Sequence, residues 1–167
     1  MIFSLPSNVA PVDQGDVIDG CPILRIARFD LGASERSDVT CIAARAMILT
    51  QTCDLAQRKT SQLTVAIVFP AQELIDRKLV TATDVRGSIR AGRVFGWYFL
   101  PKSVSLGLPE SIVDLRNLHT VPLTVLEQLV QAGRRVAHVE PLYREHLAKH
   151  FADTYSRIGL PMPYETE

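Results

Sequence analysis

The sequence lacks any long hydrophobic run, and its apolar stretches are far shorter than the roughly 18 residues that a membrane-spanning helix requires. Its first residues, MIFSLPSNVAPVDQGD, have neither the basic start nor the long apolar core of a secretory signal. These absences predict a protein without a membrane segment or a cleaved leader, working in the cytoplasm.

Cysteine is scarce: Cys21, Cys41 and Cys53 are an odd number, widely spaced, and form no CxxC pair. This usage excludes a disulfide scaffold and is typical of reduced thiols. His146 and His150 are four residues apart and share a face of an expected helix, but the stretch HLAKH lacks the glutamate of a zinc-protease signature. We expect two surface histidines and neither a metal nor a cofactor. A metal site that one of the cysteines completes remains an open alternative.

Phosphate-binding and hydrolase motifs are also missing. The chain contains no GxxxxGK[ST], GxGxxG, HExxH or GxSxG. Readings as a nucleotide-binding enzyme or a serine hydrolase therefore have no support from motifs.

The formal net charge is zero, so global charge favours no partner. The charge is unevenly distributed, because residues 57–102 carry a balance of +5 while 1–56 carry −3 and 103–167 carry −2. The basic candidates are Arg77, Lys78, Arg86, Arg90 and Arg93, and the aromatic residues Phe95, Trp97, Tyr98 and Phe99 follow them. Basic side chains bind phosphates and aromatic rings stack on unpaired bases, which predicts contact with single-stranded RNA. The alternative is solvated charges beside a strand whose rings belong to the core.

A chain of 167 residues is long enough for one domain with its own core. Residues 1–14, with two prolines, are expected to form an irregular arm, residues 15–160 a single domain, and 161–167 a loose tail. Apolar patterning predicts strands within 17–26 (interrupted near 20–22) and at 39–50, 63–69, 95–101, 111–118 and 134–140, and helices at 71–79, 121–132 and 141–158.

The helix boundaries rest on local signals. Thr120 is the expected N-cap of the second helix and Gly133 its C′ residue, while Pro141 opens the third helix and Gly159 closes it. Early strands at hairpin spacing and later helices predict an α+β fold: a small, strongly bent SH3-like barrel with packed helices, including a C-terminal helix and a helical insert at about 71–93.

The stretch RAMILTQTCDL ends an expected core strand with four polar side chains, Gln51, Thr52, Cys53 and Asp54. Loops at strand ends often carry function. Cys53 would be a reactive thiol if a histidine or a helix N-terminus lowered its pKa. The alternative is a turn capped by Thr52 and Asp54, with Cys53 as a small buried hydrophobe.

Three segments resemble the MazF/PemK-type toxins, a growth-inhibitor family with an SH3-like barrel. They are Gly15–Ile18, Arg45–Gln51 followed by LTVAIV, and the stretch SIVDLRNLHTVPLTVLEQL. Ala46 stands where that family usually has proline, and the insert at 71–93 is longer than its usual loop. The QTCDL run and YREHLAKHFADTYSRIGLP are also similar to uncharacterised bacterial proteins, a likeness that implies no activity.

The toxin resemblance implies a bacterial toxin or phage-defence component that binds RNA and cleaves it without a metal. In that reading Arg45 stabilises charge on the phosphate, and Gln51, Thr52 and Asp54 shape the pocket and orient or deprotonate the 2′-hydroxyl. A homodimer and an antitoxin partner are implied as well.

Other readings remain open. Arg45 is also typical of an ion-paired strand arginine. The chain is alternatively a non-catalytic binding module that recognises a protein or nucleic acid through the 50–54 loop, or a thiol enzyme acting through Cys53.

Overall fold

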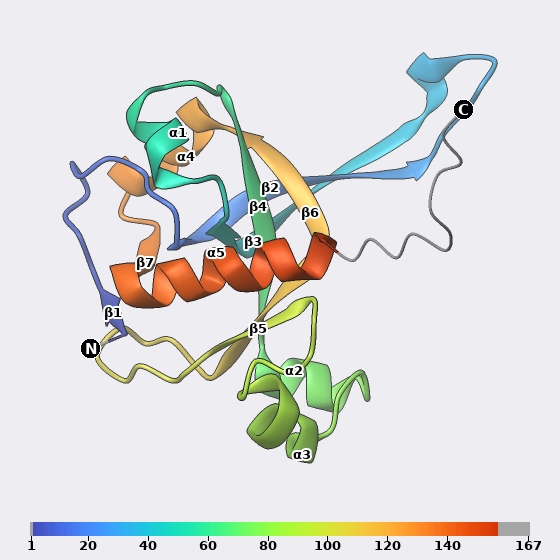
Figure 1. Ribbon diagram of the computed structural model, residues 1–167. Coiled ribbons are helices and arrows are strands. Elements are labelled where there is room, and N and C mark those ends of the chain that lie inside the picture. Colours follow the sequence, from blue (N-terminus) through green and yellow to red (C-terminus); the bar gives the residue numbers. More distant parts are fainter. Residues whose placement is uncertain (1, 157–167) are drawn as a thin grey trace, which may run out of the picture.

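The computed structural model describes residues 2–156, which form an α+β fold around one antiparallel sheet (Figure 1). Its strands are β1 (Phe3–Ser4), β2 (Asp16–Arg28), β3 (Asp38–Ile48), β4 (Gln62–Pro70), β5 (Trp97–Leu100), β6 (Ser111–Pro122) and β7 (Arg135–Val139). Its helices are α1 (Thr52–Ala56), α2 (Ala71–Asp76), α3 (Ala82–Asp84), α4 (Leu123–Gln131) and α5 (Pro141–Tyr155), with short turns η1 (Ser34–Arg36) and η2 (Val85–Ile89). The predicted α+β class and the predicted C-terminal helix are thus confirmed.

The strand order is β1-β7-β2-β3-β4-β6-β5, with every neighbouring pair antiparallel. β3 and β4 are neighbours through the pair Ala46 and Ile67, as the two apolar runs predicted. Among the described residues the sheet is open, because β1 and β5 form its two edges. It is nevertheless curved, since β2 and β6 contact each other although they are not adjacent in the order.

Each face of the sheet is covered by one long helix. Side chains alternate between faces along a strand, so Met47 and Ala46 belong to different clusters. Met47 packs on the side that α5 covers through Leu147. Ala46 packs on the side that α4 covers through Leu126. Figure 1 shows α5 crossing the sheet in front.

The outer part of β2 and β3 forms a two-stranded ribbon that projects away from the body (Figure 1). Its strands pair only with each other there, because β2 meets β7 at Asp16–Ile18 and β3 meets β4 at Ala46–Ile48. The ribbon exposes several apolar side chains, namely Leu24, Ile26, Phe29, Leu31 and Val39. The expected interruption of this strand is a register shift between Ile18 and Cys21, with Gly20 at a φ of +75°.

The insert after β4 folds as α2, α3 and the π-helical turn η2. A capping box begins α3, in which Thr81 and Asp84 bond to each other's backbone amides. Leu74, Val85 and Ile89 then form a third apolar cluster with Trp97 and Ile112. This packing places the basic insert directly beside β5.

Several predicted boundaries need correction. Thr120 is wrong as an N-cap, because β6 continues to Pro122 and Thr120 pairs with Thr64 of β4. The expected arm includes β1, which pairs with β7, and the polar connection after β3 contains α1. Gly133 has a φ of +74° directly after α4, as expected of a C′ glycine.

The expected helix over 141–158 ends earlier than predicted, since α5 stops at Tyr155. The predicted stop at Gly159 and the predicted tail at 161–167 lie outside the described residues. None of the helices within residues 2–156 is long and apolar enough to cross a bilayer.

Candidate functional site

Arg45 is held by a carboxylate of the neighbouring strand. Its Nη2 donates to Oδ2 of Asp19 at 2.9 Å, and its Nε donates to Oδ1 of the same residue. This two-pronged bond raises the pKa of Arg45, against the lowering effect of its partial burial. By strand alternation Arg45 shares the sheet face of Met47, the side covered by α5.

The residues expected to share a pocket with Arg45 lie on α1 or just before it. Gln51 is the exposed N-cap residue, and Cys53 is exposed with its sulfur 3.6 Å from Oε1 of Gln51. Asp54 forms an ion pair with Lys59 at 3.6 Å. Leu55 anchors this helix on the α4 side of the sheet, so these side chains and Arg45 belong to different faces.

Thr52 lines a cavity of about 280 Å³ between α1, the N-terminal arm and β7, which we call the arm cavity. Its hydroxyl oxygen is buried, and no hydrogen-bond partner lies within reach among the described residues. Three polar residues of this cavity, Asp13, Arg135 and His138, were not singled out by the sequence patterns. An unpaired buried hydroxyl is costly, which makes this cavity unusual.

The buried carboxylate of Asp16 contacts two residues that line the arm cavity, Arg135 and His138. Asp16 is fully buried, and its Oδ2 lies 3.3 Å from Nε of Arg135, whose side chain is only 1% exposed. Nδ1 of His138 lies 2.9 Å from Oδ1 of Asp16. The backbone amide of Asp13 donates to Oδ2 at 2.9 Å. We call Asp16, Arg135 and His138 the Asp16 network.

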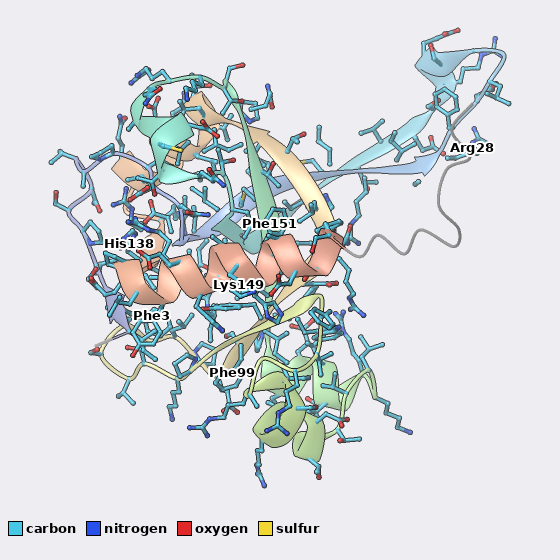
Figure 2. The ribbon with its side chains drawn as sticks, viewed as in Figure 1. Phe3, Arg28, Phe99, His138, Lys149 and Phe151 are labelled. Atoms are coloured by element: carbon cyan, nitrogen blue, oxygen red, sulfur yellow. The ribbon has the colours of Figure 1, made fainter. Side chains whose placement is uncertain are left out.

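The Asp16 network also ties the arm to the body. Arg135 donates through Nη2 to the carbonyls of Ala10 and Pro11 at 2.9 and 2.8 Å. Arg144, in the first turn of α5, forms an ion pair with Asp13. Figure 2 shows His138 close to the Pro141 end of α5.

A larger cavity of about 600 Å³ lies on the other side of α5, between β5, η2 and the start of that helix. We call it the arginine–aromatic cavity, because its lining includes Arg90, Trp97, Tyr98, Phe99, Tyr143 and His146. Such a volume is typical of sites that bind small molecules or parts of larger ligands. Phe99 lies between α5 and the insert in Figure 2.

The rings of this cavity differ in what they offer a ligand. The guanidinium of Arg116 covers Trp97 at 4.2 Å from the ring centroid, so that face is already occupied. The hydroxyl of Tyr98 donates to the carbonyl of Tyr143 at 3.1 Å, and burial, with the neighbouring Tyr143, raises the pKa of Tyr98 to about 12. The guanidinium of Arg90 lies 5.9 Å from the centroid of Phe99, which is a cation–π distance.

The basic residues of the insert divide into two groups. Arg77 is bound to Glu73 at 2.6 Å, one helical turn earlier. Lys78 is exposed, with a φ of +57°. Arg86, Arg90 and Arg93 are exposed, and within residues 2–156 none of them forms an ion pair. Of these three, Arg90 lines the cavity.

The two histidines that were expected at the surface, His146 and His150, lie in different environments. His146 is exposed, whereas His150 is 5% exposed and lies 5.8 Å from Tyr98, centroid to centroid. Burial, followed by the neighbouring His146, lowers the pKa of His150. Among residues 2–156 no group of three or more His, Cys, Asp or Glu side chains is arranged to hold a metal ion.

The three thiols are free. Cys21 is fully buried, and burial, with a smaller contribution from Cys41, raises its pKa to about 11. That thiol is therefore protonated and sheltered, while Cys41 and Cys53 face solvent.

The structure thus separates residues that the sequence grouped together. Arg45 is paired on one face, Thr52 lines the arm cavity on the other, and Arg90 lines the arginine–aromatic cavity. The signal for the Asp16 network was weak but present: a Gly-Asp pair opening one strand, and Arg135 and His138 in the polar strand RRVAHVE. Neither a scan against protein-family models nor a search of curated proteins finds a match for this chain.

Proposed function

We propose that the protein binds single-stranded RNA and that one or more bases occupy the arginine–aromatic cavity. The observation that carries this proposal is the placement of Arg90 over Phe99 at the wall of a 600 Å³ cavity. An aromatic wall stacks on a base of any sequence, and stacking contributes about 1–3 kcal/mol per base. An unpaired guanidinium beside it binds the phosphate that joins that base to the next.

The exposed arginines beside the cavity extend this surface. Arg86 and Arg93 come from the same insert as Arg90, and no ion pair within residues 2–156 neutralises them. Phosphates are bound through such charges without regard to sequence, so they position the strand while the cavity receives the base. We assign a smaller role to Arg77, because Glu73 already neutralises it.

The wider reading remains a proposal drawn from the resemblance to MazF/PemK-type toxins. We propose that the curved sheet is an SH3-like barrel and that the protein acts as a homodimer in the bacterial cytoplasm. We further propose a toxin or phage-defence role, with an antitoxin or other protein partner. The contact between β2 and β6 supports the barrel. Assigning RNA cleavage to Arg45 finds less support, since Asp19 occupies its guanidinium.

The test is the affinity of purified variants for a fluorescein-labelled single-stranded RNA, measured by fluorescence anisotropy. Arg90→Ala is expected to weaken binding roughly 10-fold to 100-fold, because a hydrogen bond to a charged group contributes about 1.5–3 kcal/mol. Arg77→Ala is the matched control, since it removes an arginine from the same insert that an ion pair already holds.

If the wild-type protein binds the RNA and both variants lose affinity to the same extent, the assignment of RNA binding to this cavity is wrong. Absence of binding by the wild-type protein would overturn the proposed function itself.

A further inference from the structure

The charged side chains that line or adjoin the arm cavity are already paired with one another. Asp13 forms an ion pair with Arg144, and the buried Asp16 forms one with Arg135. In the described part of the chain the cavity therefore offers no unpaired charge as long as His138 is neutral. A charged ligand would lose its hydration here without gaining a counter-charge, which is costly. The charge balance thus favours an uncharged ligand.

The rest of the cavity wall is apolar. These side chains come from the N-terminal arm and from α1, and they are Pro6, Ala10, Pro11, Val12, Leu55 and Ala56. An apolar cavity of roughly 150 Å³ already accommodates benzene, and this one has a volume of about 280 Å³. The space therefore suits an apolar body somewhat larger than one aromatic ring.

His138 presents a hydrogen-bond acceptor to this cavity. Its Nδ1 lies 2.9 Å from Oδ1 of Asp16. An ionised carboxylate accepts and does not donate, so in the neutral imidazole the proton is on Nδ1 and the acceptor is Nε2. Among the described residues Nε2 has no hydrogen-bond partner. The ring is also held in place, because Arg135 and the amide of Asp13 bind Asp16 in turn. A ligand in the cavity therefore meets an oriented acceptor and needs one donor.

Thr52 adds a second polar group to the same wall. Its hydroxyl is buried and has no partner in the part of the chain that the structure describes. Such a group is stabilised when a ligand atom accepts its proton. A ligand hydroxyl both donates and accepts, whereas an indole N–H only donates. A hydroxyl is therefore the donor that suits His138 and Thr52 together.

We propose that the arm cavity binds a small uncharged molecule with an apolar body and one hydroxyl group, of which phenols are the simplest class. The hydroxyl donates to Nε2 of His138, and the apolar body packs between the N-terminal arm and α1. This site shares no lining residue with the arginine–aromatic cavity. The proposal goes beyond the proposed binding of RNA and does not depend on it. Because the ligand contacts the arm, α1 and β7 at once, its binding also fastens the arm to the body.

The experiment is an NMR titration of the isotope-labelled full chain with phenol, followed through backbone amide resonances at about pH 8, where imidazoles are generally neutral. Saturating shifts are expected within residues 10–13, 52–56 and 135–138, with a dissociation constant of roughly 1–10 mM for so small a ligand. Fluorobenzene is the matched probe, because it has nearly the same size and no hydrogen-bond donor. It should bind about 3-fold to 10-fold more weakly, the contribution of one neutral hydrogen bond.

A pair of alanine variants locates the site. Ala56 lines the cavity from the exposed end of α1, so Ala56→Phe places a ring where the ligand would lie, and phenol binding should be lost. Ala152→Phe is the control, since Ala152 is exposed on α5 and lines neither cavity. This variant should keep the wild-type affinity. Neither alanine is buried, so both variants are expected to fold.

Each other outcome overturns the proposal. If fluorobenzene binds as tightly as phenol, His138 is not the acceptor and the cavity does not select a hydroxyl. If Ala56→Phe binds phenol as wild type does, or if both variants lose affinity equally, the ligand does not lie in the arm cavity. If phenol leaves the resonances of this cavity unchanged, the cavity does not bind this class of molecule. The anisotropy measurements on RNA are separate, so none of these results bears on the proposed function.

Discussion

Arg135→Ala is expected to lower the free energy of unfolding by about 3–5 kcal/mol, the cost of leaving one partner of a buried ion pair without its counter-charge. Asp16 is fully buried and has Arg135 as its cationic partner at 3.3 Å. The same substitution removes the bonds from Arg135 to the carbonyls of Ala10 and Pro11, which fasten the N-terminal arm. The measurement is equilibrium unfolding in urea, followed by circular dichroism.

The control for this prediction is the preceding residue. Arg134→Ala removes the same charge, but the side chain is exposed, so a change within about 0.5 kcal/mol is expected. The double variant Asp16→Leu with Arg135→Met should regain part of the lost stability, because neither charge is then buried alone. Equal stability of Arg134→Ala and Arg135→Ala would contradict the account of the Asp16 network.

Removing all three unpaired arginines beside the larger cavity should abolish most of the salt dependence of RNA binding. Each phosphate contact contributes about −0.7 to the slope of log K against log salt for a single strand. If Arg86, Arg90 and Arg93 make three such contacts, wild-type affinity falls roughly 20-fold between about 50 and about 200 mM salt. The triple alanine variant should bind weakly with a nearly flat dependence, measured by anisotropy across a salt series.

A variant of equal charge tests the position of these contacts. Arg25, Arg28 and Arg36 are exposed on the ribbon or at its tip, far from the insert in Figure 1, so replacing all three by alanine removes three positive charges elsewhere. That variant should keep most of the wild-type slope. If both triple variants flattened it to the same degree, the binding surface would not be the one proposed.

Local patterns predicted the elements whose burial is decided within one segment. The apolar run LTVAIVF became β4, and its neighbour was β3 as expected. Gly133 ends α4 because a positive φ at that position favours a residue without a Cβ. Thr120 failed as a cap because pairing with Thr64 continues the strand, and a tertiary contact of this kind overrides a local capping signal.

The candidate sites depended on contacts between distant residues. Asp16 and His138 are 122 residues apart in the chain, and Arg144 is 131 residues from Asp13. No spacing rule joins such groups, since the sheet order brings β7 beside β2. Arg45 looked available in the sequence because its partner, Asp19, lies on another strand. The basic insert was the exception, because its arginines and the aromatic strand are close in sequence as well as in space.

The most direct test of the central claim is photocrosslinking of single-stranded RNA that contains 4-thiouridine, followed by mass spectrometry of the tryptic peptides. A base seated in the arginine–aromatic cavity should crosslink to the peptide VFGWYFLPK, which follows Arg93 and carries Phe99. Crosslinks confined to the ribbon or to α1, or none at all under conditions where RNA is bound, would contradict the assignment of that cavity as the RNA site.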